Sequence, residues 1–197
     1  MSEPDSDHFE MRRLESLSNT IFGVAMTLLA YDLPKAGFED LPSWTELYRL
    51  YAAPLSGLVL SFIIAGIFWF SHHRRLARQP YGSRHVVFLN LLFLLSIILL
   101  PVTNRLDGSY GLSPAVAVLY GLHLTVIAAL NAGLWWLINR HDRHHREFIA
   151  SVFPVLVLLP GTLVALFAPQ YAQYFWFLAF GGLVVRCFFP TSPTPSG

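Results

Sequence analysis

Polar side chains interrupt an otherwise apolar stretch near the start of the chain, between residues 14 and 33. A hydroxyl or carboxamide placed in hydrocarbon must find a hydrogen-bond partner, so a helix that faces only lipid does not require such residues. Their side chains could join neighbouring helices, or could replace part of the water shell of a permeating cation. The polar residues of this stretch are Ser16, Ser18, Asn19, Thr20 and Thr27.

Helical periodicity gathers part of this stretch on one side. Residues three or four positions apart lie on the same face of an α-helix. From the pattern alone two interpretations are open, namely close packing between helices and the lining of a water-filled pore or cavity. The stripe consists of Thr20, Val24, Thr27 and Tyr31, with Leu28 beside it.

The composition indicates which solvent surrounds this stretch. Hydrophobic residues make up 54% of the 197 residues and charged residues only 13%, which is about half the charged share of a soluble domain. These values exclude a soluble enzyme domain, a disordered chain and a disulfide-stapled secreted module. A net charge of +1 gives no basic excess for nucleic acid. We therefore expect an all-α polytopic membrane protein.

Six apolar stretches predict six transmembrane helices, at about 20 residues for each crossing. Residues 1–12 form a predicted cytoplasmic N-terminal segment, 13–189 one membrane domain, and 190–197 a disordered tail rich in Pro and Ser. Pro160 falls inside the fifth stretch, where membrane helices tolerate a kink. The expected spans are about 14–33, 54–71, 86–104, 114–138, 149–167 and 171–189.

The distribution of positive charge predicts the orientation of these spans. Ten of the 13 Lys and Arg residues fall on the side that holds both termini, and such residues favour the cytoplasmic side. The acidic N-terminus is unlike a secretory signal, so we expect the first helix to stay in the protein. The expectation is a multi-pass protein of the cell membrane with both termini in the cytoplasm.

The start of the first helix carries a recognisable signature. Arg13 and Ser18 fit the pattern R-x-x-x-F-S-D, which precedes an apolar helix containing Thr. Leu17 stands at the position where this pattern has Phe, and Asn19 stands at the position where it has Asp. Because Asn19 is neutral, Arg13 lacks the acidic partner that the Asp of that pattern would provide. Glu10 or Glu15 could act as the partner of Arg13 instead.

Later motifs extend the signature into the second and third helices. The second ends with Trp69 followed by His72, His73 and an arginine, and the third contains Asn90 in the run Asn-Leu-Leu-Phe-Leu. Together these motifs resemble the transmembrane protein 175 family of potassium channels, in its prokaryotic single-repeat branch. The resemblance covers about the first half of the chain, and the second half resembles the family only in its general pattern of apolar helices.

The resemblance implies a passive, potassium-selective cation channel without a carbonyl filter, and no run like T-V-G-Y-G occurs in this sequence. It implies a homotetramer in which first helices line a central pore. A hydrophobic constriction that serves as gate and filter would begin eleven residues after Arg13, at Val24. The next residues facing the pore would be Thr27, Leu28 and Tyr31.

The resemblance also implies supporting roles for residues outside the constriction. His72 and His73 would pack against the region from Arg13 to Ser18 and hold the first helix in register, and they could add sensitivity to pH. Thr20 and Asp32 are expected in the pore vestibules, although Asp32 fits a solvated residue at a helix end equally well. The remaining members of the expected structural network are Asn19, Trp69 and Asn90.

Other functional classes find less support in the sequence. No catalytic constellation occurs, so we expect neither an enzyme nor a cofactor or structural metal, with potassium only as the permeant ion. A proton-coupled transporter would need ionisable residues within the spans, which are nearly absent. His123 and Asn131, two turns apart in the fourth span, could form a buried polar pair or part of a proton relay, and structural hydrogen bonding is the expected role. A membrane scaffold without transport stays open, and the expected partners are further copies of the chain, lipids and monovalent cations.

Overall fold

The computed structural model describes residues 8–35, 37–38, 40–76, 81–139 and 145–188, so the expected tail 190–197 lies outside the described residues. The described residues are almost entirely helical, which confirms the all-helical prediction. They form six α-helices, a short 3-10 helix and two three-residue strands. These are β1 (His8–Glu10), α1 (Met11–Leu29), η1 (Ala30–Asp32), α2 (Trp44–Leu76), β2 (Tyr81–Ser83), α3 (Arg84–Tyr110), α4 (Pro114–Asn139), α5 (His145–Ala165) and α6 (Pro169–Phe188).

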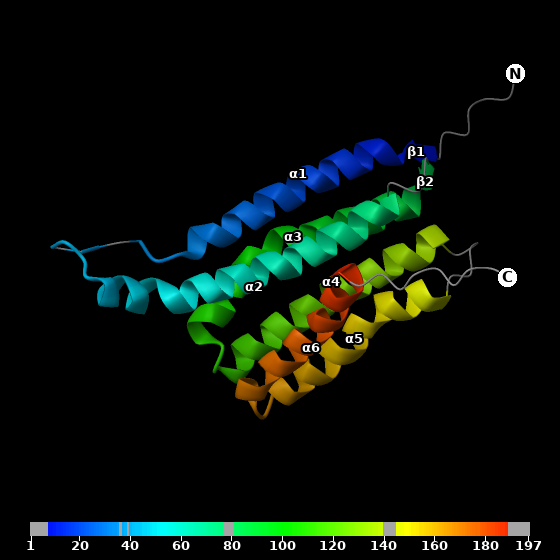
Figure 1. Cartoon of the computed structure of the whole chain (residues 1–197). Coiled ribbons are helices and arrows are strands. Elements are labelled where there is room, and N and C mark those ends of the chain that lie inside the picture. Colours follow the sequence, from blue (N-terminus) through cyan, green and yellow to red (C-terminus); the bar gives the residue numbers. More distant parts are fainter. Residues whose placement is uncertain (1–7, 36, 39, 77–80, 140–144, 189–197) are drawn as a thin grey trace, which may run out of the picture.

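The helices form an elongated bundle in which α1 occupies an edge (Figure 1). Helix α1 packs on α2 and α3, whereas α4 packs between α3 and α5, and α6 packs on α5. Helices α4 and α5 approach closely because Gly121 has no side chain, since a Cβ there would lie 2.6 Å from Thr162 Oγ1. The edge position leaves one face of α1 without a neighbour in the described chain.

Apolar residues at helical spacing hold α1 on the bundle. Phe22 is 1% exposed, and its ring lies 5.9 Å from the rings of Phe93 on α3 and His72 on α2. Truncation of a buried Phe to Ala typically costs about 3–5 kcal/mol, so Phe22 is a main anchor of this helix. The other buried residues of α1 are Met11, Leu14, Ser18, Ala25 and Leu29.

A two-stranded sheet, which the all-α prediction did not include, fixes the start of α1. Strand β1 pairs antiparallel with β2, with His8 opposite Ser83 and Glu10 opposite Tyr81. Met11 is buried against Gly82, where a Cβ would collide with the methionine sulfur. Three-residue strands contain too few residues for a visible alternation of apolar and polar side chains, so the sequence carried no signal for them.

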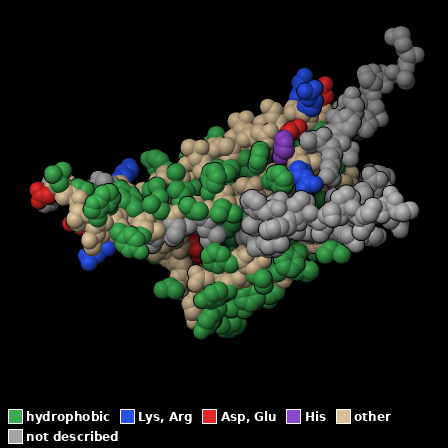
Figure 2. Space-filling model, viewed as in Figure 1, with side chains coloured by type: hydrophobic (Ala, Val, Ile, Leu, Met, Phe, Trp, Pro, Cys, Tyr) green, Lys and Arg blue, Asp and Glu red, His purple; other side chains and the backbone are tan. Residues whose placement is uncertain are grey.

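The long apolar helices are consistent with a membrane protein. By length and composition, α3 and α4 could each cross a membrane, and the part Ser151–Ala165 of α5 is a shorter apolar segment. Figure 2 shows apolar side chains along the middle of the molecule and most of the visible charge at its two ends. Helix α2 begins ten residues before the predicted span 54–71, because the Ser43 and Glu46 side chains cap it and Pro54 is accommodated within it. A helix can extend beyond its membrane span, and the six crossings stay a prediction.

Candidate functional site

Helix α1 presents a mixed polar and apolar face that no other described helix covers. Val24 is 56% exposed, Leu28 is 44% exposed and Tyr31 is 70% exposed. Thr20 and Thr27 are exposed on the same side. The stripe predicted from helical spacing therefore lies on the open side of α1, opposite the face that carries Phe22, and continues into η1 at Tyr31.

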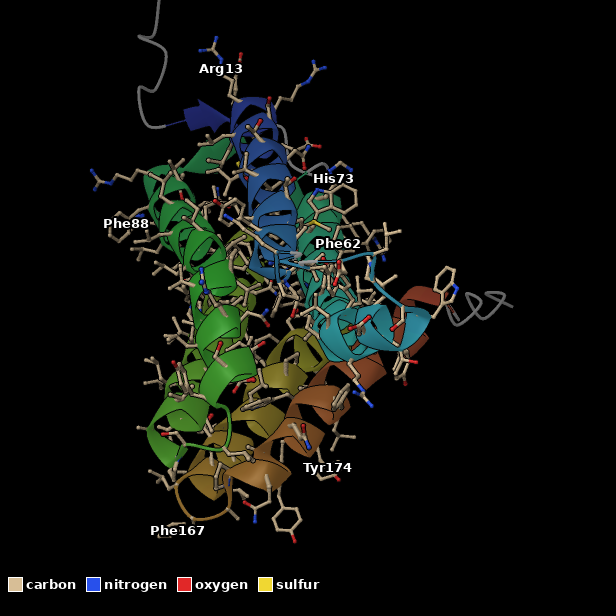
Figure 3. All side chains as sticks on the ribbon, turned by 90° about the vertical axis from the view of Figure 1, so that its left-hand side faces the viewer. Arg13, Phe62, His73, Phe88, Phe167 and Tyr174 are labelled. Atoms are coloured by element: carbon tan, nitrogen blue, oxygen red, sulfur yellow. The ribbon has the colours of Figure 1, made fainter. Side chains whose placement is uncertain are left out.

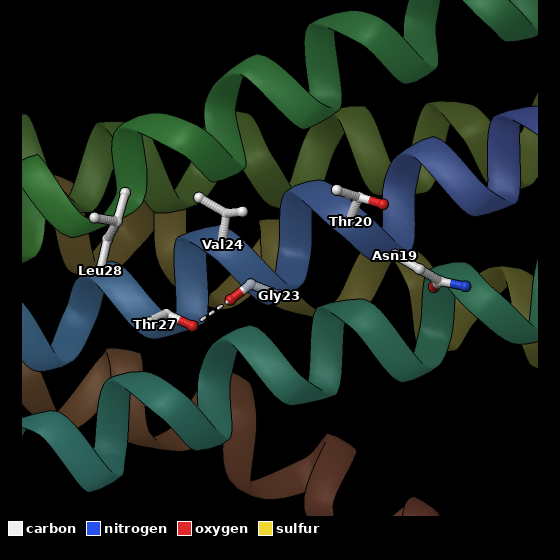
Figure 4. Close-up of a pocket in the computed structure, with 6 residues that line it drawn as sticks. All are labelled: Asn19, Thr20, Gly23, Val24, Thr27 and Leu28. Atoms are coloured by element: carbon white, nitrogen blue, oxygen red, sulfur yellow. Dashed lines mark hydrogen bonds between the residues drawn. The ribbon is translucent and has the colours of Figure 1, made fainter.

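The open face is hollowed in its middle (Figure 4). The hollow has a volume of about 350 Å³, and Gly23 contributes no side chain to it. Tyr31 lies beyond the hollow, and Asp32 belongs to η1 with its side chain outside the described part of the chain. The lining residues are Asn19, Thr20, Gly23, Val24, Thr27 and Leu28.

Both threonines of the hollow donate their hydroxyl hydrogen to their own helix. Thr27 Oγ1 donates to the Gly23 carbonyl oxygen at 2.8 Å, as Figure 4 shows, and Thr20 Oγ1 donates to the Ser16 carbonyl oxygen at 3.0 Å. A hydroxyl used in this way keeps its two acceptor lone pairs. Each threonine can therefore offer an oxygen to a donor or a cation on the open side.

A buried chain of hydrogen bonds fixes the other side of α1. His72 Nε2 lies 2.5 Å from Asn90 Oδ1, Asn90 Nδ2 donates to Ser18 Oγ at 3.3 Å, and Ser18 Oγ donates to the Leu14 carbonyl oxygen at 2.7 Å. All three polar side chains are at most 2% exposed. The chain links α2, α3 and α1, and it meets the hydrogen-bonding needs of polar groups that would otherwise destabilise the bundle.

Asn90 Oδ1 can only accept, so His72 Nε2 carries a proton and donates, which fixes the direction of this chain. Burial lowers the pKa of His72 to about 4, and the nearby charges of Arg75 and His73 act in the same direction, against the hydrogen bond with Asn90. The ring is therefore neutral near pH 7, with Nε2–H donating to Asn90 Oδ1. This leaves the Asn90 amide group free to donate to Ser18, which is the direction observed.

A second contact between α1 and α2 borders the hollow. Trp69 Nε1 donates to Asn19 Oδ1 at 2.8 Å. The Trp69 ring stacks on His73 with ring centroids 5.4 Å apart. His73 Nδ1 lies 3.0 Å from Glu15 Oε1, close enough for an ion pair when protonated but without the alignment of a hydrogen bond. Trp69 and His73 of α2 thus contact two residues of α1, Asn19 and Glu15, that lie one helical turn apart.

Arg13 lies apart from this network. Its side chain is 88% exposed and pairs with Glu10, with Arg13 Nε and Glu10 Oε2 3.1 Å apart. Figure 3 shows it pointing away from the bundle at the end of α1. Of the seven residues expected in the structural network, the structure brings together Ser18, Asn19, Trp69, His72, His73 and Asn90, but not Arg13.

The structure adds a buried arginine that the sequence reasoning missed. Arg75 is 6% exposed, and its Nη1 donates to the Asn131 carbonyl oxygen at 2.8 Å and to Asn131 Oδ1 at 3.0 Å. The spacing could have indicated this role. Arg75 follows His72 by three positions, so the two residues lie on the same face of α2. Asn131 therefore bonds to α2 rather than to His123, which contacts Thr103 and the Ser96 carbonyl oxygen of α3.

The described residues contain no group of three or more His, Cys, Asp or Glu side chains that could hold a metal ion. The open face of α1 offers hydroxyl, amide and aliphatic groups instead. Such a surface can bind water and monovalent cations weakly and can exclude water where the aliphatic groups dominate.

Comparisons with known proteins match the part of the chain that carries this site. Residues 13–101 match the family described as "Endosomal/lysosomal potassium channel TMEM175". A potassium channel of Streptomyces collinus is 32% identical over 142 residues, which cover 66% of this chain and 66% of that relative. A potassium channel of a Chryseobacterium species is 24% identical over 177 residues, covering 84% of this chain and 88% of the relative. The chain thus aligns with about two thirds of the first relative.

Solved structures show the same fold. The crystal structure of a lysosomal potassium-selective channel TMEM175 homolog from Chamaesiphon minutus superposes with a TM-score of 0.72 at 18% identity, over 89% of this chain and 97% of the other. The potassium channel MtTMEM175, in complex with a nanobody–MBP fusion, gives a TM-score of 0.59 at 14% identity, over 95% of this chain and 98% of the other. At these identities the similarity concerns the fold.

Proposed function

We propose that this chain, which belongs to the TMEM175 family of potassium channels, conducts potassium passively through a pore lined by α1. A potassium channel lies in a membrane and is not an enzyme. The finer parts of the proposal concern the pore helix, the assembly, the gate and the orientation. The pore helix, the assembly and the gate rest on residues of the open face of α1 and on the contacts behind it, and the orientation rests on the distribution of Lys and Arg.

The open face of α1 is the observation that carries the proposal. Thr20, Thr27 and Asn19 sit on this face among exposed aliphatic residues, and polar groups of this kind are costly against lipid. A tetramer with α1 from each copy around a central axis turns the face toward water. The self-assembled pore thereby gives water and cations access to the remaining lone pairs of Thr20 and Thr27, and it explains why the face lacks a neighbour within one described chain.

The hollow supplies two kinds of ring in such a tetramer. Val24 and Leu28 form apolar rings that can close the pore by excluding water. Thr27 forms a ring of hydroxyl oxygens whose hydrogens are already donated to Gly23, so the lone pairs face the ion. Thr20 contributes a similar oxygen closer to the start of α1. Potassium selectivity then comes from side-chain oxygens next to an apolar constriction.

The two ends of the pore helix have supporting roles in this proposal. Tyr31 narrows the far end, and Asp32 provides an acidic ring that concentrates cations there. At the near end, the chain from His72 through Asn90 to Ser18 holds α1 in register behind the pore. The excess of Lys and Arg on the side of both termini supports a multi-pass protein with its termini in the cytoplasm.

The test is a flux measurement on the purified full chain in liposomes. A potassium gradient is imposed, and electrogenic flux is followed with and without a protonophore, with sodium as the competing cation. A channel gives potassium flux that does not require proton exchange. Absence of flux supports the scaffold, and flux that strictly requires protons supports the transporter. Native mass spectrometry of the same sample gives the subunit number, and a stable monomer contradicts the α1 pore.

A further inference from the structure

A contact between a cation and an aromatic ring lies just beyond α1, at the end of the bundle opposite β1 and β2 (Figure 1). Lys35 Nζ lies over the Tyr31 ring, 5.7 Å from the ring centroid. Within about 6 Å the negative face of an aromatic ring attracts an ammonium group. Tyr31 is 70% exposed, so its ring can receive another cation when Lys35 leaves it.

The local sequence explains why the chain turns after Tyr31. The 3-10 helix η1 ends one residue later, and Leu33 is extended, with φ −61° and ψ 138°. Pro34 favours this conformation, because the residue before a proline avoids the helical region. The helix therefore stops here, and Lys35, the first residue after the proline, lies close enough to reach back over the ring.

The ammonium group of Lys35 is not neutralised by a described neighbour. No side chain that the structure describes forms an ion pair with it, and the Tyr31 ring is its recorded contact. Lys35 is also the only lysine in the sequence. In the proposed tetramer the Tyr31 rings of all copies surround the far end of the pore, and each ring carries the Lys35 of its own chain.

We propose that the Tyr31 rings form a cation site at the far end of the pore, which Lys35 fills as a tethered ammonium group. Quaternary ammonium ions are the ligands that such a site takes, because aromatic faces bind them well. Lys35 competes with these ions at an effective concentration that is roughly millimolar for a short flexible tether. The inference rests on the proposed function, since an ion on Tyr31 blocks conduction only if Tyr31 faces the pore.

The experiment measures block of potassium flux by tetraethylammonium in liposomes that contain the full chain. K35Q removes the positive charge and keeps a long side chain, so block should need a concentration about five- to tenfold lower. One exposed cation–π contact changes an affinity by about two- to fivefold, and more than one ring faces the ion. K35R should block like the unaltered chain, because a guanidinium group also binds an aromatic face.

R49Q is the matched control for the loss of positive charge. Arg49 is exposed near the start of α2, on the same side of the predicted membrane as Lys35, and no contact joins it to the Tyr31 ring. R49Q should leave the block by tetraethylammonium unchanged. An equal gain in sensitivity in K35Q and R49Q would assign the effect to the overall charge of this end and overturn the proposal.

The ring is tested by combining K35Q with a change at Tyr31. The double variant K35Q/Y31F keeps an aromatic face and should keep the tight block, whereas K35Q/Y31L should lose it. Equal block in these two double variants overturns the aromatic site, even if K35Q alone is more sensitive than the unaltered chain.

A second measurement detects the contact without any ion flux. Reductive methylation with isotope-labelled methyl groups marks Lys35 as the only lysine and keeps its positive charge. The ring current of Tyr31 should shift the methyl signal of Lys35 upfield in an NMR spectrum, K35R should assign the signal by removing it, and Y31L should remove the shift. A signal at the position of free dimethyl-lysine in the unaltered chain overturns the tethered cation.

The two measurements separate this inference from the proposed function. Absence of potassium flux in the unaltered chain overturns the pore, and block at the Tyr31 site is overturned with it. Normal flux with the same tetraethylammonium sensitivity in K35Q and the unaltered chain overturns the cation site alone.

Discussion

Asn19 Oδ1, at the edge of the hollow, accepts a hydrogen bond from Trp69 Nε1 at 2.8 Å. The bond ties a residue of the open face of α1 to the helix behind it. Asn19 thus lies both in the proposed pore wall and in the support of that wall. It also stands where the family signature usually has Asp, and an oxygen acceptor is what the two residues have in common.

Asn19 should tolerate replacement by Asp better than replacement by Leu. A carboxylate oxygen can accept from Trp69 as the amide oxygen does, whereas N19L would leave the indole N–H without that partner at a cost of about 1 kcal/mol. N19D should keep the melting temperature and raise potassium flux, because the added charge attracts cations. Thermal unfolding and liposome flux measure the two effects. A lower flux for N19D would contradict the placement of Asn19 at the pore.

Val24 should set the basal conductance. V24A shortens the side chain that excludes water from the proposed constriction, so potassium flux without any stimulus should rise several-fold. L95A is the matched control, because Leu95 is an exposed aliphatic residue of α3 at 52% exposure. Unchanged flux and ion preference in V24A would mean that the constriction lies at another residue or on another face.

Thr27 should act through its hydroxyl oxygen. T27V keeps the shape of the side chain and removes the oxygen, so potassium flux should fall while assembly stays unchanged. T125V is the matched control, since Thr125 on α4 makes the same bond to the carbonyl oxygen four residues earlier, Gly121, at 2.7 Å. Equal losses in the two variants would indicate a general effect on helix stability, which a thermal melt would reveal.

His72 should make stability fall in mild acid. Its folded pKa of about 4 lies below its ordinary value of 6.5, so the unfolded chain binds more protons between these values. The stabilisation is present above about pH 6.5 and is lost progressively toward pH 4, by an amount on the order of 3 kcal/mol. H72Q should flatten this part of the unfolding profile, and H85Q, at an exposed histidine, should leave it unchanged. Two identical profiles would contradict a buried neutral His72.

Helical periodicity placed Thr20, Val24 and Thr27 together on one side of α1, and the structure shows all three exposed there. The sequence left open whether Glu10 or Glu15 pairs with Arg13, and the structure pairs Arg13 with Glu10 while Glu15 lies beside His73. Surface ion pairs are weak and depend on side-chain directions that spacing does not define. The sequence also did not predict the pairing of β1 with β2, because this pairing depends on where the connection after α2 returns rather than on a local pattern.

Arg75 should be essential for stability, in contrast to its neighbour Arg74. The Arg75 guanidinium is buried and donates to Asn131 and to Ser71 Oγ, so it joins α2 to α4 behind the network that holds α1. R75A leaves these buried neutral acceptors unpaired, which typically costs about 1–3 kcal/mol. R75K should recover only part, because an ammonium group cannot reproduce the planar fork that reaches both helices. R74A is the matched control, because Arg74 is exposed and lies over the Phe70 ring at 5.5 Å. Melting curves for the three variants should therefore rank R74A above R75K and R75K above R75A. Equal stability of R74A and R75A would mean that α2 is held to the bundle by its apolar contacts alone.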